Sequence, residues 1–450
     1  MTRYLYSVTF IAFLFFQPLQ ADAQVASNSI PKQLSLAQAE TLLVQRNFAV
    51  LAAKYQVEAS RAARLIASYK PNPAVTIGME QIPVYSPIKG SYPRFFETNP
   101  DAGANPVYTL RLDQLWERGG KRELRTAAAD SDLKASEAQL LNAIRTQLFQ
   151  LRNAFATAAL ARDNLALAET AEQQYAQTEA LTQIKVSQGD IAGVETYRVS
   201  AGRLQYQQAV LQARTSYNAA IRDVLNLLGA GDQDIAPMQV ASLSQIPESL
   251  RGEPIELVAA LDDRPVFQTV VELRNMALAN RPDVIAARNQ LASATTGTRL
   301  AAAQHIRDLD VGYEYQRVGS DYAVGMVAQF PLFTHNNQAA LLKQAQALEN
   351  AAEAQLKQAE FQVVTDVEKA YQGYVSARKV LDLYSTTTLS QLEKLQSIAA
   401  LSYRNGASSL FELLDAQRAH NVAMTAYNQA RFDYQTAIWQ LEQATGSPLQ

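Results

Sequence analysis

The chain contains two copies of one unit, and this internal repeat restricts its fold more than any other feature. Residues 47–54 (Asn-Phe-Ala-Val-Leu-Ala-Ala-Lys) resemble residues 281–288 (Arg-Pro-Asp-Val-Ile-Ala-Ala-Arg), 234 positions later. Further along, residues 189–195 align with residues 406–412, 217 positions later. A repeat of about 200 residues predicts that both copies carry the same order of elements.

The repeat divides the chain into four segments. Residues 24–229 are the first copy, 230–266 a connector rich in Gly and Pro, and 267–450 the second copy. Residues 1–23 read as a signal peptide, because Arg3 precedes a short apolar run that ends in Ala21-Asp22-Ala23. That run is shorter than the roughly 20 residues of a membrane-spanning helix. An exported chain without cysteine is typical of the bacterial envelope.

Each copy is predicted to contain a helix, two strands, a very long helix and a further helix. Ser35 and Gln38 form a capping-box pattern, and Pro282 suits the first turn of a helix. Period-2 alternation predicts strands at 75–80, 108–113 and 309–315, and less regularly at 322–330. The long helices are expected over 121–187 and 337–404, each spanning about 100 Å, and each is expected to end at a glycine turn, Gly189 or Gly406.

Two details refine this expectation. The spacing of six apolar residues on the first long helix predicts a coiled-coil seam: Leu141, Ile144, Leu148, Leu151, Phe155 and Ala158. The first copy also has about 19 extra residues between its strands, around 82–105, by the alignment. The prolines of this insertion predict a loop on the outer surface.

Charge and motifs exclude several classes of protein. The balance of 40 Lys+Arg against 43 Asp+Glu argues against a nucleic-acid binder. The chain has three histidines, far apart, and no phosphate-binding loop or nucleophile motif. We therefore expect no enzyme activity, no cofactor and no resident metal.

Four sequence motifs occur in an order that resembles the TolC-type outer-membrane efflux family. They are the strand-to-helix junctions at 114–122 and 329–338, Arg281-Pro-Asp-Val284, and the segment from Gly406 to Ala416. Gly119-Gly120-Lys121-Arg122 and Pro331-Leu332-Phe333 look most like the heavy-metal (Czc/Cus-type) branch. Thr334-His335 departs from that branch, which often has a charged or polar pair there.

The resemblance implies a homotrimer in the outer membrane with a long periplasmic extension. Each chain would contribute four strands to a 12-stranded β-barrel, and the helices would form an α-barrel tunnel. Such a trimer is the passive exit duct of a tripartite RND system, fed by a periplasmic adaptor and an inner-membrane pump, here for heavy-metal cations. Alternatives are a duct for drug efflux or type I protein secretion, or a structural coiled-coil envelope protein.

The strands supply candidate residues for the barrel. Their apolar positions would face lipid, and five polar positions would face the lumen: Thr76, Glu80, Asp308, Asp310 and Glu314. The acids suit either a selectivity device or a hydrated wall. Five aromatic residues suit either interfacial girdles or ordinary packing: Tyr108, Trp116, Tyr313, Tyr315 and Tyr322.

The glycine turns supply candidate residues for a periplasmic gate. In the family, a tyrosine before the second turn and acids after both turns form the entrance network, and the matching residues are Tyr403, Glu195, Glu412 and Asp415. Ser408 stands where the family has a gate arginine, and Arg404 or Arg198 could substitute for it. Ser409 and Glu412 also match a capping box, so a purely structural role stays open.

Overall fold

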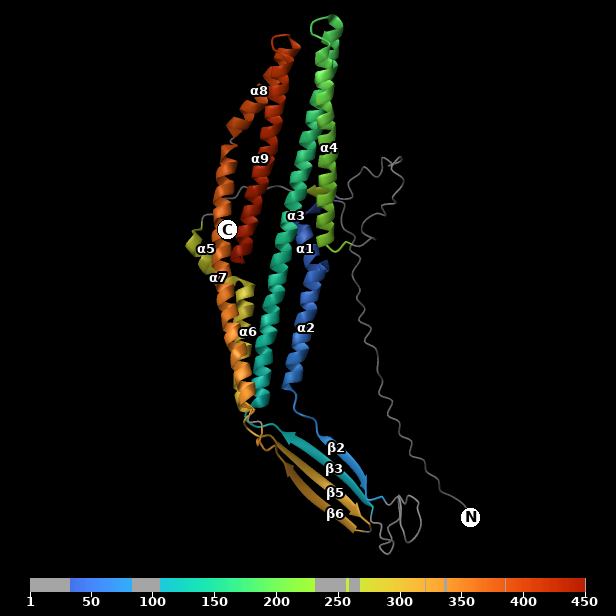
Figure 1. Ribbon diagram of the computed structural model, residues 1–450, viewed down its shortest axis with the longest axis vertical. Coiled ribbons are helices and arrows are strands. Elements are labelled where there is room, and N and C mark those ends of the chain that lie inside the picture. The colour runs from blue at the N-terminus through green and yellow to red at the C-terminus, as the bar shows by residue number, and fades with distance from the viewer. Residues whose placement is uncertain are drawn as a thin grey trace, which may run out of the picture.

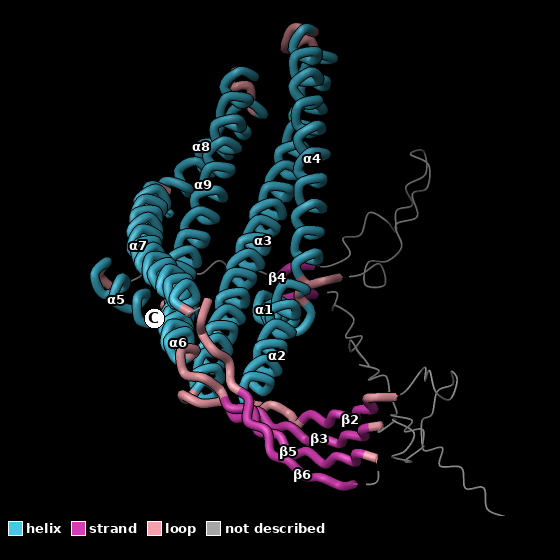
Figure 2. The backbone as a smooth tube through the Cα atoms, turned by 60° about the horizontal axis from the view of Figure 1, so that its bottom comes forward, coloured by secondary structure: helices cyan, strands magenta, loops and turns pink. Residues whose placement is uncertain are grey.

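The computed structural model describes residues 33–82, 106–230, 256–258, 268–319, 321–335, 338–384 and 386–449. Within them, long helices run side by side, and a four-stranded sheet lies at one end of these helices (Figures 1 and 2). The turns of the two helical hairpins lie at the opposite end. The predicted signal peptide, nearly all of the 82–105 insertion and most of the connector lie outside the described residues.

The first copy contains three strands and four helices among its described residues. They are β1 (Gln33–Ser35), α1 (Leu36–Arg46), α2 (Phe48–Ser68), β2 (Ala74–Glu80), β3 (Val107–Trp116), α3 (Lys121–Gln188) and α4 (Val194–Leu227). The predicted glycine turn is present, because Gly189 ends α3 with a positive φ of 81°. At 68 residues, α3 is about 100 Å long, as expected.

The connector and the second copy repeat this order with one additional break. Their elements are β4 (Glu256–Val258), α5 (Val270–Asn280), α6 (Pro282–Ala303), β5 (Leu309–Val318), β6 (Asp321–Gln329), α7 (Ala339–Leu383), α8 (Thr386–Arg404) and α9 (Leu410–Thr445). In the first copy the predicted first helix is divided in two at Asn47. In the second copy α6 begins at Pro282, as predicted, and Arg281 separates it from α5, which the sequence did not predict. These two residues occupy equivalent positions in the repeat.

The prediction of one unbroken helix over 337–404 is wrong. The helix stops at Tyr384, which leaves helical geometry with φ −91° and ψ 55°, and α8 starts two residues later. Thr386, Thr387 and Thr388 follow the break. Threonine is β-branched and its hydroxyl competes for backbone partners, so three in succession weaken a helix. Gly373, the expected weak point, stays helical.

The four predicted strands form one antiparallel sheet in the order β2-β3-β5-β6. The register places Ile77, Leu110, Tyr315 and Val324 in one row across the sheet. Thr76, Arg111 and Glu314 form a neighbouring row, which points to the other face because side chains alternate along a strand. One face is therefore apolar and the other polar. Separately, β1 and β4 pair in parallel.

Each copy has its own hydrophobic core. The core of the first copy lies between α1, α2, α3 and α4 and includes Leu151, Phe155 and Tyr217. The core of the second copy includes Leu273 from α5, Val367 from α7 and Leu441 from α9. The predicted seam on α3 is partly buried at Ile144 and Leu148 and fully buried from Leu151 onward, whereas Leu141 is 56% exposed and Leu140 packs in its place. None of the helices in the described part of the chain combines the length and apolar character that crossing a membrane requires.

Candidate functional site

Tyr403 is the best-anchored of the predicted gate residues. Its side chain is 3% exposed, and its hydroxyl lies 3.0 Å from the Oγ1 of Thr182 on α3. Since that threonine hydroxyl donates to the carbonyl of Thr178, the tyrosine is the donor of this bond. The ammonium of Lys185 lies 5.2 Å from the centre of the tyrosine ring. Tyr403 therefore joins the second hairpin to the first within one chain.

A small core surrounds this contact near the hairpin turns. Tyr175 and Val199 from the first hairpin pack with Tyr403, Leu410 and Leu413 from the second. Burial, aided by a hydrogen bond with Tyr206, raises the pKa of Tyr175, so its hydroxyl stays neutral. The two main cores each belong to one copy. Among the described residues, this small cluster is therefore the buried apolar contact between the ends of the two hairpins.

Two of the predicted gate acids, Glu195 and Glu412, bind within their own helices, and none of the three forms a hydrogen bond with Tyr403 among the described residues. Glu195 accepts two hydrogen bonds from Arg198, at 3.0 and 2.9 Å. Glu412 accepts from the backbone N–H of Ser409 at 3.1 Å, which is the capping box that the sequence allowed. Asp415 is exposed beside Arg418, in a groove that opens where α7 gives way to α8. The gate role of these acids stays a prediction.

The two candidate substitutes for the gate arginine behave differently. Arg198 pairs with Glu195, as described, on the exposed side of α4. Arg404 is exposed, and no ion pair involves it in the part of the chain that the structure describes. Thr178 and Thr182 were not recognised as functional candidates from the sequence. Their spacing of four residues, which places both hydroxyls on one face of α3, was the available signal.

The polar face of the sheet carries most of the predicted lumen residues. Thr76 and Glu314 flank Arg111 directly, and Arg111 forms an ion pair of 2.7 Å with Asp113. This pair lies over Gly312, where a Cβ atom would come within 2.4 Å of the Asp113 carboxylate. A side chain at that point of β5 would displace the ends of Asp113 and Arg111 and disturb their pair.

The remaining lumen candidates lie nearer the ends of the strands. Glu80 is the last residue of β2, and Asp310 is the second residue of β5. Asp308 precedes β5, and both of its carboxylate oxygens accept from the buried ammonium of Lys121 at 2.9 Å. Asp308 thus fastens the sheet to the start of α3. A lumen role for all five residues stays a prediction.

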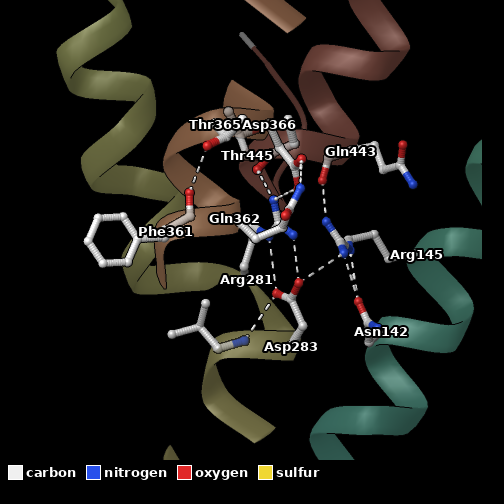
Figure 3. A network of polar contacts seen from close by, with 12 residues as sticks. Asn142, Arg145, Arg281, Asp283, Phe361, Gln362, Thr365, Asp366, Gln443 and Thr445 are labelled. Carbon is white, nitrogen blue, oxygen red and sulfur yellow. Dashed lines mark hydrogen bonds and ion pairs between the residues drawn. The ribbon is translucent and has the colours of Figure 1, made fainter. Parts of the chain in front are cut away.

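A buried charge network lies at the break between α5 and α6 (Figure 3). Arg281, 4% exposed, donates to Asp283 at 2.6 Å and to Asp366 of α7 at 2.9 Å. Its guanidinium also donates to the carbonyl of Ala444, at the end of α9. Arg145 of α3 reaches the carbonyl of Gln443, so the network connects both copies.

The pKa shifts in this network follow from burial and from neighbouring charges. Burial alone would raise the pKa of Asp283, but the hydrogen bonds and charge of Arg281 outweigh burial and lower it. Burial and the charge of Arg281 lower the pKa of Arg145. The sequence drew attention to Arg281 and Asp283 as part of the internal repeat and of a family motif, but it gave no sign of their partners.

Comparison with known proteins adds three findings. A family model described as outer membrane efflux protein matches residues 273–447. The alkaline protease secretion protein AprF of Pseudomonas aeruginosa is 24% identical over 344 residues, covering 74% of this chain and 67% of AprF. The outer membrane protein TolC of Vibrio cholerae is 27% identical over 314 residues, covering 62% of this chain and 71% of TolC.

The comparisons support the outer membrane efflux protein family. The crystal structure of CusC superposes with a TM-score of 0.72 at 14% identity, over 95% of this chain and 99% of CusC. The fold is thus that of TolC-like outer-membrane channels. The matched family model and the TolC relative indicate the outer membrane as the location. The two relatives and CusC are described as secretion, membrane or channel proteins, not as enzymes.

Proposed function

We propose that this chain is one subunit of a homotrimeric outer-membrane exit duct, which conducts substrates passively from a periplasmic adaptor and an inner-membrane pump. The observation that carries the proposal is the open sheet. Among the residues that the structure describes, β2 and β6 each pair on one side only, so the four-stranded sheet has two free edges there. Free edges in a membrane leave backbone groups unsatisfied, and closure into a barrel removes them.

The layer of helices, like the sheet, has an outer element on each side. In the half of the molecule near the sheet, α2, α3, α6 and α7 pack in this order, so α2 and α7 are the outer helices. α2 carries an exposed heptad seam with spacings of four and three: Phe48, Ala52, Tyr55, Ala59, Ala62 and Ile66. An exposed coiled-coil seam calls for a helix from another subunit.

The free edges of the sheet and the two outer helices both suit a ring of identical subunits joined head to tail. β2 of one chain would pair with β6 of the next, and α2 would pack on α7 of the same neighbour. Three chains with four strands each give a 12-stranded barrel, an even number typical of such barrels. The apolar face of the sheet would then meet lipid, and the polar face would line the water-filled lumen.

Heavy-metal cations are the substrate class that we propose. The Gly119-Gly120-Lys121-Arg122 and Pro331-Leu332-Phe333 motifs and the likeness to the CusC fold favour it. The acids on the polar face also favour cations over anions. Protein secretion is the second candidate, because one relative is named as a protease secretion protein.

Two experiments test the proposal. Unheated purified protein should migrate as a trimer in detergent gels, and Ala59→Glu, which places a charge in the α2 seam, should abolish the trimer. Ala49→Glu is the matched control, because Ala49 is exposed on α2 but lies off the seam. A monomeric parent protein would contradict the duct.

The substrate is tested in cells that lack their own outer-membrane channel. Expression of the chain with a Czc/Cus-type adaptor and pump should restore metal tolerance and lower the cellular metal content. Restored protease secretion or drug tolerance, with unchanged metal tolerance, would replace the metal assignment by one of the alternatives.

A further inference from the structure

The four chain crossings between helices and sheet lie together at one level of the molecule (Figures 1 and 2). Hydrogen bonds fasten three of them to one another. The ammonium of Lys121 donates to the carbonyl of Ile306 at 2.7 Å, and the backbone N–H of Arg118 donates to Asp308 at 2.9 Å. Arg125 reaches the carbonyls of Ala67 and Tyr69 at the end of α2. The crossings therefore form a defined collar.

The collar has more basic than acidic groups once its ion pairs are formed. Residues 67–73, 117–125, 304–308 and 330–335 of the collar contain three carboxylates, and all three are in ion pairs: Lys121–Asp308, Arg122–Glu123 and Arg125–Glu117. Lys70, Arg118 and Arg307 are exposed, and each comes from a different crossing. In the described part of the chain none of these three has an acidic partner. Arg307 lies 5.6 Å above the ring of Phe333.

Large apolar side chains stand exposed beside these cations. Trp116, at the collar end of β3, is 63% exposed, and Phe330 and Leu332, after β6, are 50% and 66% exposed. The register places Trp116 on the same face as Leu112 and Leu110, so it continues the apolar face of the sheet. Aromatic and basic side chains combined in this way are typical of the boundary between acyl chains and headgroups.

We propose that Lys70, Arg118 and Arg307 form a belt that binds the phosphate groups of anionic phospholipids, in the leaflet nearest to the helices. This inference rests on the proposed membrane duct and adds a lipid preference to it. The apolar side chains would enter the acyl region while the three cations stay at the level of the phosphates. The belt would thereby fix the height of the barrel in the membrane.

Trp116 itself provides the probe. The chain has two tryptophans, so Trp439→Phe leaves Trp116 as the sole emitter. The trimer is reconstituted into phosphatidylcholine vesicles that contain brominated phosphatidylglycerol, or brominated phosphatidylcholine at the same mole fraction. Bromine quenches tryptophan on contact, so the ratio of the two quenching curves gives the preference for the anionic lipid. We expect brominated phosphatidylglycerol to quench more strongly, and high salt to reduce the difference.

Neutralising the belt should remove this preference. Each basic residue near an anionic surface contributes about a fivefold preference, and the change Lys70→Gln, Arg118→Gln and Arg307→Gln should bring the ratio close to one. The matched control neutralises three exposed lysines along the helices, Lys369, Lys379 and Lys394, and should leave the ratio unchanged. If both variants lost the lipid preference equally, the proposed belt would be refuted. Equal quenching by the two brominated lipids in the parent protein would also refute it.

Conductance of the same samples separates this inference from the proposed function. A trimer that conducts ions but shows no lipid preference would refute the belt alone. Absent quenching of Trp116 by either lipid, in a conducting trimer, would show that a neighbouring subunit covers the collar, which also refutes the belt. A sample without trimers or conductance would refute the duct.

Discussion

Each copy of the repeat has a helix joint, the break between α1 and α2 at Asn47 in the first copy and between α5 and α6 at Arg281 in the second. The two joints have the same architecture but are held by different chemical groups. In the first copy the amide of Asn47 donates to the carbonyl of Leu227 at 2.8 Å, and in the second the guanidinium of Arg281 donates to the carbonyl of Ala444 at 3.3 Å. Both acceptors lie at the end of the last helix of the copy, 217 positions apart. The repeat has thus kept the backbone acceptor and changed the donor from neutral to charged.

Two neighbouring contacts show the same equivalence. Lys54 donates to the carbonyl of Val44, and Arg288, 234 positions later, donates to the carbonyl of Leu278. Gly229 and Gly446 both have positive φ, and a Cβ on either would press on the joint, at 2.9 and 3.1 Å. The surroundings of the joints differ, because only the second contains Asp283, Asp366 and the nearby Arg145.

The largest difference should appear when each donor is removed. Arg281→Ala leaves the partly buried Asp283 and Asp366 with less compensation, which should cost about 3 kcal/mol of the free energy of unfolding, the low end for a buried pair. Asn47→Ala removes a helix cap and should cost about 1–2 kcal/mol. Chemical denaturation of the trimer, followed by circular dichroism, gives both values.

A charge-preserving variant tests the reason for that difference. Arg281→Lys keeps one positive charge but loses the paired geometry of the guanidinium, so its cost should lie between those of the two alanine variants. Equal costs for Arg281→Ala and Asn47→Ala would contradict the importance of the charged network.

Acid should open the second joint before the first. Because Arg281 holds the pKa of Asp283 below its usual range, ionised Asp283 stabilises the fold above its ordinary pKa of about 4. This stabilisation is lost as pH falls through the lowered pKa of the folded state. The amide of Asn47 does not titrate. Protection against hydrogen exchange, corrected for the intrinsic exchange rate at each pH, should therefore fall below about pH 4 in peptides covering 277–285 and less in those covering 43–51.

A variant without the carboxylate isolates the cause of the acid effect. In Asp283→Asn the 277–285 peptides should already be less protected at neutral pH, and their protection should lose most of its pH dependence. If these peptides kept the full pH dependence of the parent, another group would be responsible.

The sequence predicted most of the elements of the fold but not the contacts between them. Alternation and the repeat predicted all four strands of the sheet, and the absence of Gly and Pro predicted α3 within a residue or two. The break at Tyr384 was missed because no Gly or Pro marks it, and a run of threonines is a weaker signal. Partners such as Asp366 and Thr182 lie 85 and 221 residues from Arg281 and Tyr403, so local patterns could not reveal them.

A smaller effect is expected at the hairpin ends. There the Tyr403–Thr182 hydrogen bond joins the two copies, whereas the Glu195–Arg198 ion pair stays within one helix. Tyr403→Phe removes the hydroxyl that reaches Thr182, at a cost of about 1 kcal/mol per subunit. Glu195→Ala breaks an exposed pair within α4, worth at most about 0.5 kcal/mol. Single-channel conductance in planar bilayers should rise in Tyr403→Phe, and adding Glu195→Ala should change it little further.

The matched control for the hairpin ends is Tyr197→Phe. Tyr197 is 79% exposed on α4, so losing its hydroxyl should leave the conductance unchanged. Unchanged conductance in a trimeric Tyr403→Phe variant would mean that this bond does not hold the entrance closed. A large additional rise with Glu195→Ala would instead assign the gate to the acid.

The smallest expected effect concerns the long helix of each copy. It is continuous as α3 in the first copy and divided into α7 and α8 in the second. Chymotrypsin should cut after Tyr384, where α7 stops, and should spare the middle of α3, where Tyr175 is buried. Thr387→Ala favours helix by roughly 0.5 kcal/mol, so cleavage after Tyr384 should slow about twofold. Thr365→Ala makes the same exchange inside α7 and should leave the rate unchanged, because that helix is already continuous. Equal slowing in both variants would show that cleavage depends on the stability of the whole second copy, not on the break itself.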